Sequence, residues 1–514
     1  MNKSSFGTAF ALILIAAALF RGIGLDRRPM HHDEANQAVK FGALLDQGDY
    51  RYDPKDHHGP SLYYLTLPAA WAASTPTLAS LNEKVIRMVP ALFGVLLIFL
   101  ILLFGRDLGR EAKLAAGLLA ALSPIMVFFS RFYIQEMLLA AFGMALLACM
   151  WSYTRRPSRP LALWAGISAG MMYATKETSL IMFAALAGAL VLTVISERGG
   201  DIRLRARLSH VLIFLTAAVC VAFLLFSSFF QHLSGPVDSL LSFRSYIGKA
   251  AAPGWHTHPW SYYLGMLTYW KLGAGPVWSE ALVVGLALLG AISAASGKVR
   301  QTAHPALARY ILFYTCIITF LYSAVPYKTP WNAVPFYTGF LLLAGLGAAS
   351  LFRFPFKTLW PKAVLLLLFF AGAAHLGWQS YRGSFIFDAD TRNPHVYAHT
   401  SRDFLNMVKR ISDIATIHPD GEEMLIKIFA IPYETWPLPW YLRRFSRVGY
   451  WTDAEDPGSL ADVPVIIASP DLLDKLQPDL AATHLSEFYG LRHEVLTSLH
   501  IRRDLWDKFL ETRK

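Results

Sequence analysis

Four consecutive ionisable residues, His31-His32-Asp33-Glu34, follow an apolar stretch that ends near Leu25. Such residues at the mouth of a membrane span are costly unless they do chemistry or bind something charged. A carboxylate at the start of a helix is kept ionised by the helix dipole, and it could accept a proton from an attacking hydroxyl group. Asp33 is therefore our candidate base, with Glu34 beside it. The alternative is that Asp33 simply caps the helix that follows.

A second histidine pair, His57-His58, lies about two dozen residues further along. A metal site would combine one histidine of each pair with Asp33, and imidazole with carboxylate suits several divalent ions. His31 and His32 are the candidate ligands from the first pair. No tight ligand spacing supports this site, and histidine also suits phosphate contact or packing at an interface. We therefore expect a site that requires no cofactor, with a divalent metal as the alternative.

Three more segments carry a cation, two of them with a neighbouring carboxylate. Arg131 and Glu136 flank the start of a predicted span, Lys176-Glu177 lies between two spans, and Lys328 precedes another. Each could be an ion pair or a cation that snorkels to the membrane surface. Together they give every short loop on one side of the membrane one cation, which would suit an anionic lipid headgroup.

The elements that must position these residues are membrane spans. The chain is 54% hydrophobic and only 16% charged, with a mean hydropathy of +0.38, which is typical of a polytopic membrane protein. A span needs about 20 apolar residues. We predict about eleven α-helical spans, at residues 6–25, 86–105, 114–130, 135–153, 161–175, 179–196, 211–230, 280–296, 310–326, 333–352 and 363–380.

The net charge of +11 would suit a nucleic-acid partner, but its distribution argues against one. Lys and Arg concentrate in alternate loops, which is the positive-inside pattern, so the basic excess orients the chain. It predicts a cell (inner) membrane protein with a cytoplasmic N-terminus and an extracytoplasmic tetrad and C-terminus. If the first span is a cleaved signal peptide, ten spans remain and the N-terminus lies outside, while the tetrad and the C-terminus stay extracytoplasmic. The predicted inner set is Lys3, Arg106, Arg110, Lys113, Arg155, Arg156, Arg159, Arg198, Arg203, Arg205, Arg207, Lys298, Arg300, Arg309, Arg353, Lys357 and Lys362, against Arg131, Lys176 and Lys328 in the short outer loops.

Two long outer loops, at about 26–85 and 231–279, are rich in aromatic residues and histidine, so we expect them to lie on the bilayer surface. Apolar residues from Ala35 to Leu45 follow helical spacing and predict an interfacial helix that begins at Asp33.

The composition changes near residue 381. We therefore divide the chain into a transmembrane domain, 1–380, and an extracytoplasmic α/β domain, 381–514. In the second domain, residues 424–431 and 463–468 are predicted as buried strands, and 440–444 and 472–476 as short helices.

Several short strings occur in order along the chain. They are His31-His-Asp-Glu34, Tyr52-Asp-Pro54, His58-Gly-Pro60, Leu62-Tyr-Tyr64, Arg87-Met-Val-Pro-Ala-Leu-Phe-Gly94, Ser123-Pro124, Ser130-Arg131 with Glu136, Ala174-Thr-Lys-Glu177 and Trp436-Pro-Leu-Pro-Trp-Tyr-Leu-Arg443. This ordered set resembles the GT-C glycosyltransferases. It is most similar to the flippase-activity-associated subgroup of the protein O-mannosyltransferase-like superfamily, which also includes the aminoarabinose transferase that acts on lipid A.

The resemblance implies transfer of a sugar from a polyprenyl-phosphate donor to a hydroxyl group of a lipid, glycan or protein, with anomeric inversion. By position it makes Asp33 the base, with Glu34 beside it, and Glu136 a second acidic residue. Many relatives have Asp where this chain has Glu136. Some relatives place a phosphate-binding Lys where this chain has a histidine pair. Candidate contacts to the substrate are His57, His58, Arg87, Arg131, Lys176, Glu177 and Lys328.

Two other functions are weighed against glycosyl transfer. A transporter or flippase component would place ionisable residues near the middle of its spans and would contain paired halves, and neither is visible. A non-catalytic scaffold would leave the acidic and basic sets of the outer loops unexplained.

Overall fold

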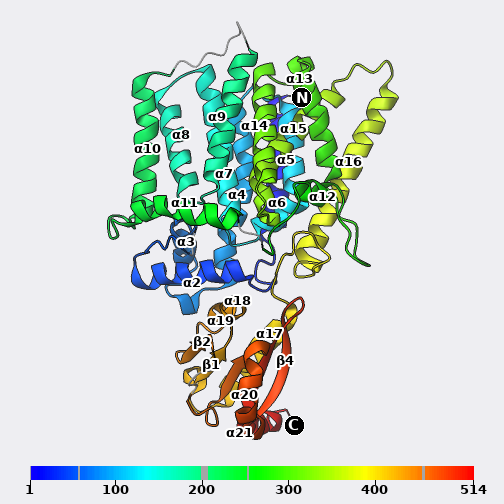
Figure 1. Cartoon of the computed structure of the whole chain (residues 1–514). Helices are drawn as coiled ribbons and strands as arrows, with labels where there is room; N and C mark the ends of the chain where they lie inside the picture. Colours follow the sequence, from blue (N-terminus) through cyan, green and yellow to red (C-terminus); the bar gives the residue numbers. More distant parts are fainter. Residues whose placement is uncertain (1, 56–57, 198–205, 252–253, 454–457, 514) are drawn as a thin grey trace.

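The computed structural model describes residues 2–55, 58–197, 206–251, 254–453 and 458–513. A bundle of long helices is followed by a smaller region with a mixed sheet, which lies beyond one end of the bundle (Figure 1). We call this end the domain side and the opposite end the far side. His57 lies outside the described residues.

Helices occur at all eleven predicted spans. By length and composition, eight helices of the described chain could cross a membrane, or nine if one bent pair is a single span. The other two, α8 (Arg159–Tyr173) and α13 (Ala281–Ala295), have 15 residues each and are short for a hydrocarbon core of about 30 Å. The eight are α1 (Lys3–Gly22), α4 with η2 (Glu83–Phe104), α7 (Glu136–Arg155), α9 (Ser179–Ser196), α10 (Leu208–Phe226), α14 (Pro305–Ala324), η4 with α15 (Pro330–Phe352), and α16 with η5 (Leu359–Ile386).

The bent pair replaces the straight span that we predicted over 114–130. Helices α5 (Arg110–Leu122) and α6 (Pro124–Ser130) meet at 60°. Ser123 between them is extended, because the ring of Pro124 disfavours helical geometry in the residue before it. The ring also suits the first position of the new helix. The break brings Arg131 to the domain side of the bundle.

Three further helices lie on the domain side. Helix α2 (His32–Gln47) and helix α11 (Gly235–Ala251) lie across the ends of the spans (Figure 1), and α3 (Ser61–Ala72) packs against α2 and α4. The apolar face of α2 is buried in a core that it shares with α3 and α4, which confirms the predicted amphipathic helix. The helix begins one residue earlier than predicted.

The C-terminal sheet has the strand order β2-β1-β3-β5-β4. Its first three strands are parallel, and β5 pairs antiparallel with both β3 and β4. Helices α17 (Arg402–Ile417) and α21 (Arg503–Glu511) share one apolar core with the sheet, and α20 (Pro470–Thr483) shares another. The strands are β1 (Ile426–Phe429), β2 (Val448–Trp451), β3 (Val465–Ala468), β4 (His484–Arg492) and β5 (Val495–Arg502).

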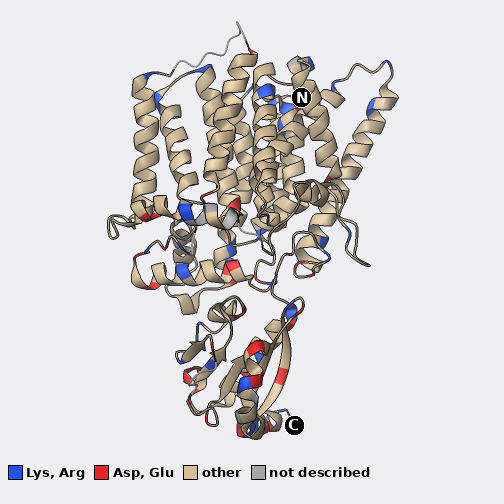
Figure 2. Ribbon diagram, viewed as in Figure 1, with Lys and Arg blue, Asp and Glu red and all other residues tan. Residues whose placement is uncertain are grey.

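Both predicted strands are confirmed as β1 and β3. The predicted short helices appear as α19 (Leu438–Tyr441) and as part of α20, while the sequence patterns missed the hairpin of β4 and β5. The division of the chain at residue 380 stays a prediction. Charged residues are sparse within the spans and gather at the ends of the bundle and on the sheet region (Figure 2).

Candidate functional site

The tetrad forms the start of α2, and His31 rather than Asp33 caps this helix. The Asp33 N–H donates to Nδ1 of His31 (3.0 Å), and His31 Nε2 lies 3.0 Å from the carbonyl oxygen of Tyr397. A backbone N–H only donates and a carbonyl only accepts, so His31 is neutral with its proton on Nε2. Burial lowers the pKa of His31 to about 4, consistent with this state. The interpretation of Asp33 as the cap is therefore wrong, because His31 does that work and leaves the Asp33 carboxylate free of it.

Glu34 is fully buried and closes the capping box by accepting the His31 N–H (3.1 Å). Its carboxylate also accepts two hydrogen bonds from Arg87 (2.8 and 2.7 Å), one from Arg28 (3.2 Å) and one from the Tyr133 N–H (2.8 Å). Burial opposes its ionisation, but the charges of Arg87 and Arg28 prevail and lower the pKa of Glu34 to about 2. Glu34 thus ties α2 to α4 and to the loop after α6.

Both arginines among the predicted substrate contacts are occupied by the fold. All five N–H donors of Arg87 are engaged, by Glu34 and by groups of residues 25–30. Arg131 donates to four carbonyl groups of residues 20–24, at the C-terminal end of α1. A cation there meets the negative end of the helix dipole. The structure therefore gives both side chains a positioning role.

Asp33 differs from Glu34 in exposure. Its side chain keeps 42% of its surface accessible, whereas Glu34 keeps 0%. Burial acts to raise the pKa of Asp33, but the surrounding positive charges outweigh it and lower the pKa below its usual value. Asp33 is therefore ionised at neutral pH. The side chains that lower the pKa of Asp33 come from three separate segments, and they are His31, His32, His58 and Lys176.

Lys176 and His58 each contact a carboxylate from another segment of the chain. Lys176 forms an ion pair with Glu136, and His58 Nδ1 lies 2.7 Å from a carboxylate oxygen of Glu177. Both pairs join segments far apart in the sequence. Lys328 is buried and donates to the carbonyl groups of His258 (3.1 Å) and Val325 (2.5 Å). It therefore holds the loop of residues 254–258 in place.

Three aromatic residues near Asp33 were missed from the sequence. His256 Nδ1 lies 2.8 Å from the hydroxyl oxygen of Tyr397, and the rings of Tyr327 and Tyr397 pack against His256. Burial lowers the pKa of His256, and the charge of Asp33 acts in the opposite direction. Burial and then the charge of Asp33 raise the pKa of Tyr327. Both side chains thus lie within electrostatic range of Asp33.

A sequence signal existed for two of these residues. Tyr327 directly precedes Lys328, and His256 lies in the aromatic loop that we placed on the bilayer surface. Tyr397 had no such signal, because it follows the last span and reaches the site only through the tertiary fold.

The string Trp436–Arg443 joins the sheet region to the tetrad. Trp440 is fully buried against α2, α3 and α4, and its indole N–H donates to Glu83 (2.8 Å). The Met30 N–H donates to the hydroxyl oxygen of Tyr441 (2.8 Å), and the Thr400 hydroxyl donates to the Met30 carbonyl (2.7 Å). Both backbone groups of the residue before the tetrad are therefore held by the C-terminal region.

We expect Tyr441→Phe to lower turnover by loosening this loop. The variant leaves the buried Met30 N–H without its acceptor, at a cost of about 1–3 kcal/mol. The effect should fall on kcat more than on KM, measured once an assay of activity is established. Tyr433→Phe is the control, since Tyr433 is exposed in the same region. Equal kcat values for the two variants would show that the bond to Met30 does not matter.

The described residues do not fit a metal centre of three protein ligands. They contain no group of three His, Cys, Asp or Glu side chains that could hold an ion, and both nitrogens of His31 face protein partners. A requirement for a divalent metal stays a prediction.

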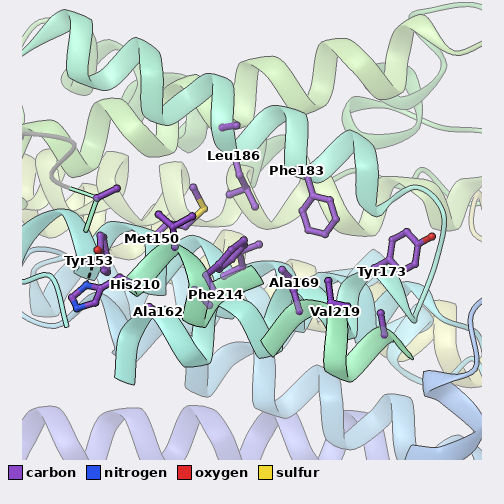
Figure 3. A pocket seen from close by; sticks show the side chains of 18 of the residues that line it. Met150, Tyr153, Ala162, Ala169, Tyr173, Phe183, Leu186, His210, Phe214 and Val219 are labelled. Atoms are coloured by element: carbon purple, nitrogen blue, oxygen red, sulfur yellow. Dashed lines mark hydrogen bonds between the residues drawn. The ribbon is translucent and has the colours of Figure 1, made fainter. Parts of the chain in front are cut away.

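A large apolar groove lies beside the site. Its volume is about 750 Å³, and residues of α7, α8, α9, α10 and α11 line it. At the far side it ends near Tyr153 and His210, which are hydrogen-bonded (2.8 Å), and at the domain side it reaches Tyr173 (Figure 3). Tyr173 lies three residues before Lys176, so the groove ends next to the ion pairs around Asp33.

Known structures share the fold of this chain. The crystal structure of ArnT from Cupriavidus metallidurans in the apo state superposes with a TM-score of 0.62 at 18% identity, over 97% of this chain and 99% of that chain. The chain has the GT-C fold. The family model described as dolichyl-phosphate-mannose-protein mannosyltransferase matches residues 67–226. No curated protein sequence matches the chain significantly.

Two ligand-bound structures share the GT-C fold. ArnT from C. metallidurans bound to undecaprenyl phosphate has a TM-score of 0.62 at 16% identity, over 95% of this chain and 97% of that chain. The oligosaccharyltransferase AglB from Archaeoglobus fulgidus, in complex with an inhibitory peptide and a dolichol-phosphate, has a TM-score of 0.50 at 13% identity, over 91% of this chain and 69% of that chain. The GT-C fold and the apolar helices make this chain an integral membrane protein.

Proposed function

We propose that this protein transfers a sugar from a polyprenyl-phosphate donor to a hydroxyl group of a lipid, glycan or protein. The observation that carries the proposal is the half-exposed Asp33 carboxylate, set among cationic side chains where the apolar groove ends. A base and a nearby positive field are what displacement from a sugar phosphate requires.

The groove supports a lipid-linked donor. It extends along spans α7 to α10 and is almost wholly apolar, so a prenyl chain would lie in it with its phosphate at the domain side. The undecaprenyl phosphate in ArnT and the dolichol-phosphate in AglB are ligands of the same chemical class.

In the proposed reaction, Asp33 accepts the proton of the acceptor hydroxyl as its oxygen attacks the anomeric carbon. The bond between that carbon and the phosphate oxygen breaks, and polyprenyl phosphate leaves with the bonding electron pair. Attack opposite the leaving group inverts the anomeric centre. Lys176 and His58 would stabilise the charge on the departing phosphate, while Glu136 and Glu177 hold them in place.

The charge pattern supports an orientation for this site. Among the described residues, Lys and Arg are concentrated in the loops of the far side, which favours a cytoplasmic far side and an Asp33 outside the cell (inner) membrane. The donor would then be used from the outer leaflet, and the C-terminal region would face the acceptor.

We expect Ala187→Trp to weaken binding of long-chain donors. Ala187 is exposed and lines the groove, so an indole ring there would take the place of prenyl units. KM for a long-chain donor should rise about tenfold, which corresponds to about 1.4 kcal/mol, while a short-chain donor should be affected less. Ala184→Trp is the matched control, because Ala184 is exposed on the same helix outside the groove. Equal KM values for both variants would contradict a prenyl chain in this groove.

The proposed function is tested in two steps. Mass analysis of envelope lipids and glycans from a deletion strain should reveal one accumulated sugar-loaded carrier and one acceptor that lacks the sugar. The purified protein in vesicles should then transfer that sugar from the carrier to the acceptor. Movement of the carrier across the vesicle membrane without any transfer would contradict the proposal and would favour the transport alternative.

A further inference from the structure

Three arginines line one small cavity beneath the tetrad. The cavity has a volume of about 10 Å³ and is also lined by Gly24, Leu25, Phe128 and Ser384. The arginines are Arg28, Arg87 and Arg131, with exposed fractions of 7%, 1% and 6%. A space of this size holds at most one particle about as large as a water molecule.

The positive charge around this cavity is not balanced by protein carboxylates. Glu34 is the one carboxylate in contact with these arginines among the described residues. Asp388 acts on Arg28 and Arg131 from a distance, but its two oxygens bind Arg402 (2.7 and 2.9 Å). Three buried positive charges thus face one buried negative charge, and uncompensated buried charge is costly.

The three arginines repel one another, and burial together with this repulsion lowers the pKa values of two of them. Burial first, and then repulsion from Arg28 and Arg87, lower the pKa of Arg131 to about 9. Burial and the charge of Arg87 also lower the pKa of Arg28, although the charge of Glu34 acts in the opposite direction. Carbonyl groups at the end of α1 and the rings of Phe128 and Phe132 offset part of the charge, but none of them carries a full negative charge.

Two buried donors at the cavity also have no partner. Arg28 Nε and the hydroxyl of Ser384 make no hydrogen bond with any described residue, and both side chains are more than nine-tenths buried. A buried polar group without a partner costs about 1–3 kcal/mol. A ligand that accepts two hydrogen bonds and carries a negative charge would satisfy both donors and balance part of the positive charge.

We propose that this cavity binds a monatomic anion of the size of chloride. The anion would balance the arginine cluster and accept hydrogen bonds from Arg28 and Ser384. It would lie at the junction of α1, the turn after α6 and the end of α16, and it would stabilise the same Glu34–Arg87 connection that holds the tetrad. This site is separate from the proposed donor site and does not depend on glycosyl transfer.

The test uses the purified full-length chain and compares sodium chloride with sodium gluconate at equal ionic strength. We expect a saturable rise of a few degrees in Tm with chloride and none with gluconate, since only a ligand that fits the folded state stabilises it. Crystals grown in sodium bromide should show an anomalous peak in the cavity. Equal Tm values in the two salts, or a folded protein with no bromide peak, would overturn the proposal in favour of a water molecule.

Two variants separate the site from general effects of salt. Ser384→Ala removes one proposed donor and should weaken the chloride midpoint several-fold. Arg392→Gln removes a charge from an exposed ion pair and should leave the midpoint unchanged. An unchanged midpoint in Ser384→Ala would overturn the proposal even if chloride raises Tm.

Discussion

Asp33→Asn should abolish sugar transfer while the protein stays folded. The amide has the shape of the carboxylate but cannot accept a proton, and loss of a general base lowers turnover by about 10²–10⁴-fold. The Asp33 side chain is 42% exposed and does not cap α2, so the free energy of unfolding should change by less than about 0.5 kcal/mol. Turnover in vesicles and Tm of the same preparation measure the two effects.

The control for this variant is Asp46→Asn on the same helix. Asp46 accepts the Leu78 N–H through one carboxylate oxygen (3.0 Å), and an asparagine oxygen can accept it too. Turnover of this control should be close to that of the native chain. Native turnover by Asp33→Asn would contradict the assignment of Asp33 as the base. Loss of folding would show that the carboxylate has a structural role.

Glu34→Gln should have the opposite profile, with a large loss of stability. Removing one partner of a buried, hydrogen-bonded ion pair costs about 3–5 kcal/mol, because the remaining charge stays buried without compensation. Here the variant leaves both Arg87 and Arg28 without their carboxylate. We expect a marked fall in Tm and in the yield of folded protein, with any loss of turnover following from it.

Glu111→Gln is the matched control for Glu34. Its ion pair with Arg353 is 31% and 43% exposed, and such a pair contributes about 0–1 kcal/mol. The two variants remove the same charge, so a similar fall in Tm would contradict the role assigned to Glu34.

The pH dependence of the stability of the native protein provides a second test of Glu34. The lowered pKa of Glu34 stabilises the fold at pH values above about 4.5, and this stabilisation is lost as pH falls towards about 2.

The tetrad shows what the residue pattern could predict and what it could not. Spacing and composition predicted an amphipathic helix beginning at Asp33 and named the two carboxylates as a pair, and the helix begins at His32. The helix start and the resemblance favoured Asp33 as the base, but the sequence could not show which of these two neighbouring carboxylates is accessible. The structure separates them, since one side chain projects into accessible space and the other fills a pocket made by α4 and the loop after α6.

The predicted substrate-binding cations show the same limit of the sequence pattern. The scarcity of Lys and Arg in the short loops of the domain side drew attention to Arg131, Lys176 and Lys328, and Arg87 came from the resemblance. Only Lys176 is among the charges that act on Asp33. Arg87, Arg131 and Lys328 bind backbone carbonyls instead. A sequence pattern cannot show which guanidinium or ammonium group is already occupied, because the carbonyls come from distant segments.

By itself, the sequence determined the membrane class, the approximate positions of the spans, the amphipathic helix of the tetrad and two strands of the sheet. Each of these follows from local periodicity, which short-range hydrophobic burial imposes on every segment. The tertiary structure alone decided that Asp33 is accessible, that His31 is a neutral cap, and that Tyr397 and Tyr441 of the C-terminal region reach the tetrad. The bonds of Tyr397 to His31 and of Tyr441 to Met30 join residues hundreds of positions apart, and the order of residues carries no direct record of which partners meet.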